Sequence, residues 1–251
     1  MASSPTLPAQ PNNSLILGVE CLRLVTGAGG AVGSREVARR LGMTHTRINR
    51  LLGTLAFMGL LERDADRRYR PGPALHALAA QSMMASRLLP AALPVLRELG
   101  RDGYTVALGT LWAGKVCYLY HQRYGQSQDE AILGHELWPA GQSSIGVALL
   151  AAKDEPPDEA EPAEVPPGST LLPGQEVGAT VAEARARGFA ILRFDDDVVS
   201  IGVAVGHPPV AGIAVSRRHL GGEFLEAVAT RLHDAAEEID RRMHGPQNLS
   251  R

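Results

Sequence analysis

The first part of the chain carries apolar residues at helical spacing. The spacing predicts four helices, over residues 15–25, 35–41, 45–59 and 73–99. In the third, apolar residues at i, i+3, i+4 and i+7 form one buried stripe of Ile48, Leu51, Leu52 and Leu55. Ser34 and Thr44 are expected to cap the second and third helices. Pro90 is expected to break the fourth.

Residues 60–72 predict a small β-hairpin, because a short apolar run and a turn lead into a basic return strand. From Tyr104 onward the pattern changes to short β-rich runs mixed with helices. Strands are predicted within residues 104–111, 116–123, 130–138, 189–194, 199–206 and 210–216, and helices over 143–152, 177–187 and 221–243. Gly188 ends the second of these helices, and residues 153–174 form an acidic, proline-rich loop. This half is predicted to be an α+β domain with an antiparallel sheet.

Length and composition narrow the class of protein. The 251 residues, of which 45% are hydrophobic and 21% charged, suit one large globular domain or two small ones. The sequence offers no apolar run long enough to cross a membrane and no secretory signal, and residues 1–13 are expected to be a disordered tail. Two cysteines favour a reducing cytoplasm, and the histidine and cysteine spacing predicts neither a metal site nor a cofactor.

The net charge of −2 conceals an asymmetry. Residues 1–80 carry ten arginines against five acidic residues, whereas the remainder carries 15 basic and 22 acidic residues. A basic small part joined to an acidic larger part suggests that the first part meets a polyanion. Only two of the basic residues, Lys115 and Lys153, are lysine. A preference for arginine suits phosphate contacts, but a GC-rich genome would explain it equally.

The first two turns of the third helix carry side chains that suit base recognition. When the stripe is buried, the open face presents His45, Thr46, Asn49, Arg50 and Gly53. Arginine can bridge guanine, asparagine can bridge adenine, and threonine can meet a thymine methyl group. The return strand at residues 67–70 would hold phosphates. The alternative is a helical hairpin with a solvated polar face.

Two glycine-rich stretches resemble nucleotide loops without their context. Thr26–Gly33 fits the loop of extended short-chain dehydrogenases, but a helix follows where a second strand is needed, and the Tyr-x-x-x-Lys pair is missing. Gly109–Val116 resembles a P-loop, but both flanks predict strands, so a hairpin turn is expected. Gly141–Ile145 fails the G-x-S-x-G pattern. An enzyme is therefore not expected, and an oxidoreductase-like protein using the first loop is the alternative.

The order of SREVARRLGMTHTRINRLLGTLAFMGLLERDADRRYRPG, VALGTLWAGKVCYL, SSIGVALLA, EARARGFAI and VAGIAVS resembles the isocitrate-lyase-regulator (IclR) family of bacterial transcription factors over residues 14–243. The resemblance implies a winged helix-turn-helix domain over residues 14–73, a linker helix over 74–89, and a GAF-like effector-binding and oligomerisation domain over 90–245. It also implies a homodimer or homotetramer on a double-stranded DNA operator. The DNA-facing positions would be Ser34, Arg35, Thr44, His45, Thr46, Arg47, Asn49, Arg50, Arg67, Arg68, Tyr69 and Arg70.

The effector domain departs from the family pattern. Family members often carry His-Ala-Thr-Ala-x-Gly-Lys where this chain has Gly141–Val147, and Ser200 stands where a cysteine is frequent. The expected pocket residues are Leu108, Gly134, His135, Trp138, Ser143, Asp195, Ser200, Ala214 and Ser216. Fewer polar groups and an added tryptophan imply a more apolar or aromatic effector. Two alternatives stay open: a pocket filled by its own side chains, and a second domain that only dimerises.

Overall fold

The computed structural model describes residues 9–126, 137–153, 176–194 and 196–245. The chain divides into two compact units between Ser86 and Arg87. Lys153, the first residue of the predicted loop at 153–174, ends a helix, and the rest of that loop and most of the predicted strand at 130–138 lie outside the described residues. None of the helices in the described ranges is long and apolar enough to cross a membrane.

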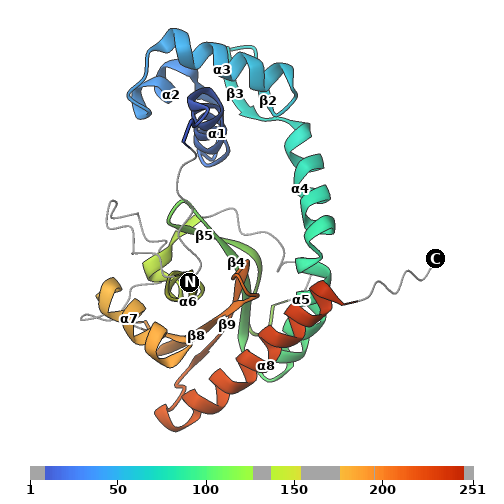
Figure 1. Cartoon of the computed structure of the whole chain (residues 1–251), viewed down its shortest axis with the longest axis vertical. Coiled ribbons are helices and arrows are strands. Elements are labelled where there is room, and N and C mark those ends of the chain that lie inside the picture. The colour runs from blue at the N-terminus through green and yellow to red at the C-terminus, as the bar shows by residue number, and fades with distance from the viewer. Residues whose placement is uncertain (1–8, 127–136, 154–175, 195, 246–251) are drawn as a thin grey trace, which may run out of the picture. The chain divides into compact units, whose positions relative to one another are not determined.

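The N-terminal unit consists of four helices and a small sheet (Figure 1). Its elements are α1 (Asn13–Thr26), β1 (Val32–Gly33), α2 (Ser34–Arg40), α3 (His45–Phe57), β2 (Leu61–Arg63), β3 (Arg68–Pro71) and α4 (Pro73–Ser86). The three strands are antiparallel in the order β1-β3-β2, so β2 and β3 form a wing next to the helices. This confirms the helix–turn–helix–hairpin arrangement predicted from the sequence.

The core of the N-terminal unit explains why α3 has one apolar face. Ile48 and Leu52 have no exposed surface and pack with Cys21 and Val25 of α1. Their spacing of four residues places both on the same side of the helix. Leu51 and Leu55 are only partly buried at the edge of this core. Burial of this face leaves the opposite face of α3 free for solvent or a partner.

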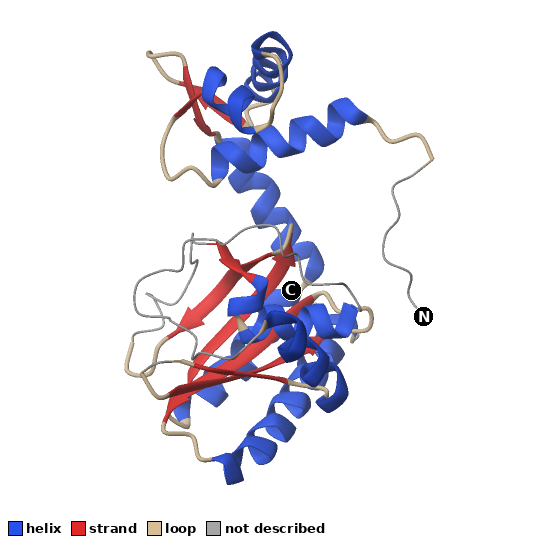
Figure 2. Ribbon diagram, turned by 90° about the vertical axis from the view of Figure 1, so that its left-hand side faces the viewer, coloured by secondary structure: helices blue, strands red, loops and turns tan. Residues whose placement is uncertain are grey.

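The C-terminal unit is an antiparallel sheet with helices on both faces (Figures 1 and 2). Its elements are α5 (Leu88–Arg101), β4 (Thr105–Trp112), β5 (Lys115–Gln122), β6 (Leu137–Pro139), a 3-10 turn (Ala140–Gln142), α6 (Ser144–Lys153), α7 (Val177–Arg187), β7 (Ala190–Arg193), β8 (Val198–Val205), β9 (Ala211–Arg218), a 3-10 turn (Gly222–Phe224) and α8 (Leu225–His244). The strand order is β6-β5-β4-β9-β8-β7. The predicted α+β class is confirmed.

The two faces of this sheet have different coverings. Helices α5 and α8 lie side by side on one face and bury the largest apolar cluster against β4, β8 and β9. Helix α6 covers the other face and contacts α7. Nearly every residue of α6 is buried, because the sheet lies on one side of the helix and α7 on another. Gly188 ends α7 with φ of 85°, as its position after the helix predicts.

Three local predictions are wrong. The long helix breaks at Arg87, which has φ of 56°, and not at Pro90, which is tolerated because it lies in the first turn of α5. Ser34 is the first residue of α2, and Gly33 holds the N-cap position. Helix α1 begins at Asn13, inside the predicted tail, because the Asn12 side chain accepts hydrogen bonds from the amides of Ser14 and Leu15.

Candidate nucleic-acid interface and ligand cavity

The outer face of α3 presents the polar side chains predicted from the sequence. Thr44, at the N-cap, is exposed, as are the five helical positions His45, Thr46, Arg47, Asn49 and Arg50. The helix begins after a tight turn in which Gly42 has φ of 61°, a conformation that glycine adopts without strain. The result is a short convex surface of hydroxyl, amide, imidazole and guanidinium groups.

The starts of α2 and α3 are joined by a side-chain contact. Ser34 Oγ and His45 Nε2 share a hydrogen bond of 2.9 Å. Among the described residues, neither helix start is capped by its own N-cap side chain. Arg35, the next residue of α2, is exposed. The Ser34 hydroxyl therefore does not cap α2 as predicted, and it bonds to the first residue of α3.

The wing carries only part of the predicted basic surface. Arg67, with φ of 61°, and Arg68 are exposed at the turn. Arg70 is exposed and forms an ion pair of 2.8 Å with Glu62 on the neighbouring strand. Tyr69 is 2% exposed and belongs to the core, with the Arg63 guanidinium 5.6 Å from its ring centre. The prediction of Tyr69 as a DNA contact is therefore wrong, because alternate residues of a strand face opposite sides.

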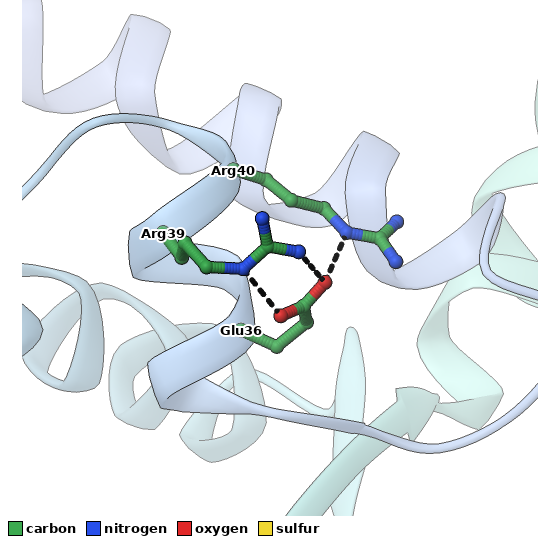
Figure 3. A network of polar contacts seen from close by, with 3 residues as sticks. All are labelled: Glu36, Arg39 and Arg40. Carbon is green, nitrogen blue, oxygen red and sulfur yellow. Dashed lines mark hydrogen bonds and ion pairs between the residues drawn. The ribbon is translucent and has the colours of Figure 1, made fainter.

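Two further arginines of α2 are already engaged within the helix (Figure 3). Glu36 accepts hydrogen bonds from Arg39 Nη2 and Arg40 Nε, each of 2.7 Å. These bonds lower the pKa of Glu36 to about 2. The ion pairs reduce the positive charge that this helix offers to a polyanion. The exposed basic groups that remain closest in sequence to the two helix starts and the wing turn are Arg35, Arg47, Arg50, Arg67 and Arg68.

The glycine-rich stretches are turns. Residues 27–31 connect α1 to the short strand β1, so a helix precedes the loop where a dinucleotide fold has a strand. The strand that the nucleotide alternative requires directly before this loop is therefore replaced by α1. Ala113 and Gly114 form the turn of the β4–β5 hairpin, both with positive φ, which confirms the predicted hairpin.

The C-terminal unit contains a cavity of about 1200 Å³. It lies on the α6 side of the sheet, and its wall includes side chains of β4, β5, β8 and β9 together with the segment before α6. Five of the predicted effector residues line it: Trp138, Ser143, Ser200, Ala214 and Ser216. Gly134, His135 and Asp195 lie outside the described residues.

Leu108 does not line this cavity. It is fully buried in the cluster formed with α5 and α8, whereas its neighbour Ala107 lines the cavity. The prediction chose the wrong residue of the strand. Both faces of β4 are covered by helices, so its sequence, TVALGTLW, shows no polar alternation that would reveal which side chains face α6.

The floor of the cavity is a set of linked hydroxyl groups. Ser216 Oγ donates a hydrogen bond of 2.9 Å to Ser200 Oγ, which is also 2.8 Å from Ser144 Oγ. Tyr118 Oη and Ser143 Oγ share a hydrogen bond of 2.9 Å. Three hydroxyl groups joined by two hydrogen bonds retain one unused donor hydrogen. The floor can therefore donate to an acceptor atom of a ligand.

One wall of the cavity is aromatic. The rings of Tyr118 and Trp138 meet edge to face, with centroids 6.2 Å apart, and the His121 ring is 5.6 Å from that of Tyr118. Sequence reasoning found Trp138 but missed Tyr118, His121 and Ser144. Tyr118 and His121 lie in a predicted strand, but the sequence of that strand does not show which of its side chains face α6.

The mouth of the cavity is basic. Arg101, Arg123, Arg217 and Arg218 line it together with Asp102 and Asp196. Arg218 forms an ion pair of 3.0 Å with Asp196, and the Arg217 guanidinium lies 5.8 Å from the ring centre of Tyr104. Burial and the neighbouring Arg123 both lower the pKa of His121, so the neutral imidazole is favoured. More arginines than carboxylates favour an anionic ligand. The described residues contain no cluster of ligands for a metal ion.

Comparison with known proteins identifies the N-terminal unit. Residues 15–65 match the model of the IclR helix-turn-helix domain. No curated protein matches the chain significantly in sequence. Solved structures share its fold over more than nine tenths of its length, among them three at 22–23% identity.

A structure from Silicibacter sp. TM1040, assigned as an IclR transcriptional regulator, has a TM-score of 0.73 at 22% identity, covering 94% of this chain and 98% of its own. An IclR family transcriptional regulator from Brucella abortus has a TM-score of 0.72 at 23% identity, covering 95% of both chains. An IclR homolog from Microbacterium hydrocarbonoxydans, complexed with 4-hydroxybenzoate, has a TM-score of 0.61 at 22% identity, covering 92% of this chain and 99% of its own. The chain therefore carries an IclR helix-turn-helix domain at residues 15–65 and shares the fold of these regulators along its length.

Proposed function

We propose that this chain is a transcriptional regulator of the IclR family, that it binds a specific operator through α3, and that a small molecule bound in the C-terminal cavity changes its affinity for that operator. The observation that carries the first part is the outer face of α3, where exposed base-reading side chains lie opposite the buried Ile48 and Leu52. Arg47, Asn49 and Arg50 read base edges, while Arg67 and Arg68 at the wing turn hold phosphates.

The cavity supports the second part of the proposal. A volume of about 1200 Å³ accommodates a small organic molecule, so a pocket filled by its own side chains is disfavoured. The aromatic wall at Tyr118 and Trp138 and the arginine-lined mouth favour an aromatic anion, which agrees with the 4-hydroxybenzoate bound to the Microbacterium relative. Its binding would favour one arrangement of the DNA-reading units over another, through a coupling free energy of about 1–3 kcal/mol.

The surface of α4 supports assembly into a homodimer or homotetramer. This helix is rich in alanine, leucine and methionine, and all its residues are exposed or partly exposed, with Leu78 54% and Met84 69% exposed. An apolar helix of this kind gains stability by contact with a second copy. On this proposal, residues 14–73 read DNA, 74–89 link and dimerise, and 90–245 bind the effector.

Binding of the full-length protein to its own upstream intergenic DNA, compared with random DNA of equal length at two salt concentrations, tests the first part. We expect specific binding to exceed random binding by about a thousandfold or more. Arg50→Ala should relax base preference, whereas Arg68→Ala should weaken all DNA about equally and lower the salt dependence by about one unit of slope. Equal losses on specific and random DNA in both variants would contradict these roles.

Titration with 4-hydroxybenzoate, followed by fluorescence of the cavity residue Trp138 in a Trp112→Phe background, tests the second part. Trp112 is the only other tryptophan and is 48% exposed at the end of β4. We expect saturable binding and a change in operator affinity on ligand addition. Operator binding that is specific but unaffected by 4-hydroxybenzoate and a metabolite panel would support a C-terminal unit that only dimerises.

A further inference from the structure

The two helices of the DNA-reading motif begin at residues that contact each other. Ser34 opens α2 and His45 opens α3, eleven residues later, and their side chains share the 2.9 Å hydrogen bond. Ser34 is partly buried, whereas His45 is exposed. The bond therefore links the partly buried Ser34 side chain to the exposed His45 side chain, which is accessible to a partner.

The bond determines which part of the imidazole ring is available. Nε2 is engaged with Ser34, so Nδ1 is the ring nitrogen left for a base edge. An exposed histidine without this bond would sample several rotamers about its two side-chain torsions. A bond to a partly buried serine selects one orientation before DNA arrives, which reduces the entropy lost on binding.

The hydroxyl of Ser34 is available for this task because it does not serve its own helix. Gly33 occupies the N-cap position of α2, and within the described residues that helix start has no side-chain cap. A serine side chain near a helix start commonly bonds to a nearby backbone group of its own helix. Here the bond runs to the neighbouring helix across the Gly42 turn, so the same contact joins the two helix starts.

We propose that Ser34 is a positioning residue for operator recognition: it orients the imidazole of His45 through Nε2 so that Nδ1 meets the edge of one base pair. The inference rests on the proposed function, because it assumes that α3 reads DNA. It differs from the expectation that Ser34 itself contacts DNA, since it assigns the specificity to His45 and the orientation to Ser34.

The test uses full-length protein and DNA sites selected from a random oligonucleotide pool by the wild type. Four variants are compared on the selected site, on each single-base substitution of it and on random DNA: Ser34→Ala, Ser34→Thr, His45→Ala and the double alanine variant. Thr26→Ala is the control, since it removes a hydroxyl that bonds within α1, to the carbonyl of Arg23. Thermal unfolding checks that each variant is folded.

We expect Ser34→Ala to lose about three- to tenfold in affinity for the selected site and to leave random DNA binding unchanged. The loss should fall on the same base pairs that His45→Ala relaxes, and the double variant should be no weaker than His45→Ala alone. Ser34→Thr, which keeps the hydroxyl, should restore the wild-type preference.

Three results would overturn the proposal: additive losses in the double variant, an equal loss on random DNA, or no change in base preference with Ser34→Ala. A wild type that selects no site would overturn both this inference and the proposed function. A wild type that selects a site with Ser34→Ala unchanged would overturn this inference alone.

Discussion

Replacement of Gly202 by alanine is expected to displace α6 and weaken ligand binding. Gly202 lies in β8 directly under the start of α6. A Cβ atom at this position would lie 2.5 Å from the carbonyl carbon and oxygen of Ser144 and 2.9 Å from the amide nitrogen of Ile145. All three are backbone atoms, which cannot rotate away. Ordinary contacts need about 3.5–4.0 Å, so the helix start has to move by about 1 Å.

The magnitude follows from overpacking in a dense core. Such insertions cost about 1–3 kcal/mol, offset by about 0.5–1 kcal/mol because alanine restricts the unfolded chain more than glycine does. The net loss of up to about 2.5 kcal/mol corresponds to a fall in Tm of up to about 10 °C for a unit of this size. Ser144 would move with the helix and lengthen its 2.8 Å contact with Ser200. Ligand affinity should therefore fall by tenfold or more.

The assay combines calorimetry of the full chain with ligand titration and operator binding. Gly178→Ala is the matched control, because this exposed glycine in the first turn of α7 has nothing within 4 Å of its Cβ position. It should stabilise the protein by up to about 1 kcal/mol. Operator affinity without ligand should be unchanged in both variants. A Gly202→Ala protein with wild-type Tm and ligand affinity would refute the reasoning.

Three further predictions address other parts of the chain. Leu52→Ala should destabilise the N-terminal unit by about 2–5 kcal/mol, measured by denaturant unfolding, because the side chain is fully buried; a loss below 1 kcal/mol would contradict this. The Glu36 carboxyl should titrate near pH 2 by NMR. Because its pKa is lowered in the folded state, its ion pairs stabilise the fold above about pH 4.5, and this stabilisation is lost as the pH falls toward 2. Glu36→Gln should remove this pH dependence. Arg87→Ala should lose about 1–3 kcal/mol and speed amide exchange at the end of α8, since Arg87 Nη1 donates to the carbonyls of Met243 and Gly245; unchanged exchange there would count against it.

Local sequence patterns predicted the elements that depend on neighbours along the chain. The stripe through Ile48 and Leu52 predicted both α3 and its open face, because a helix repeats every 3.6 residues. Gly188 predicted the end of α7, since a left-handed residue at a helix end favours glycine. The Ala113-Gly114 turn predicted a hairpin in place of a nucleotide loop.

Predictions that depend on which face of a sheet a strand residue points to were less successful. The sequence predicts Tyr69 as a DNA contact beside its arginine neighbours, yet Tyr69 faces the core, because side chains alternate along β3. Leu108 was assigned to the cavity in place of Ala107, because β4 is apolar on both sides. A strand covered on both faces carries no alternation that would reveal its orientation.

The sequence by itself determined the class of this protein: a basic helix-turn-helix part with one buried helical stripe, followed by an acidic α+β part. These features follow from the charge and the spacing of apolar residues along each segment, which do not depend on contacts with distant parts of the chain. The tertiary structure alone decided which side chains meet. Ser144 and Ser200 are 56 residues apart, and Arg87 bonds to a carbonyl 156 residues away. Such pairs depend on how strands and helices pack, and local spacing carries no record of contacts over that distance.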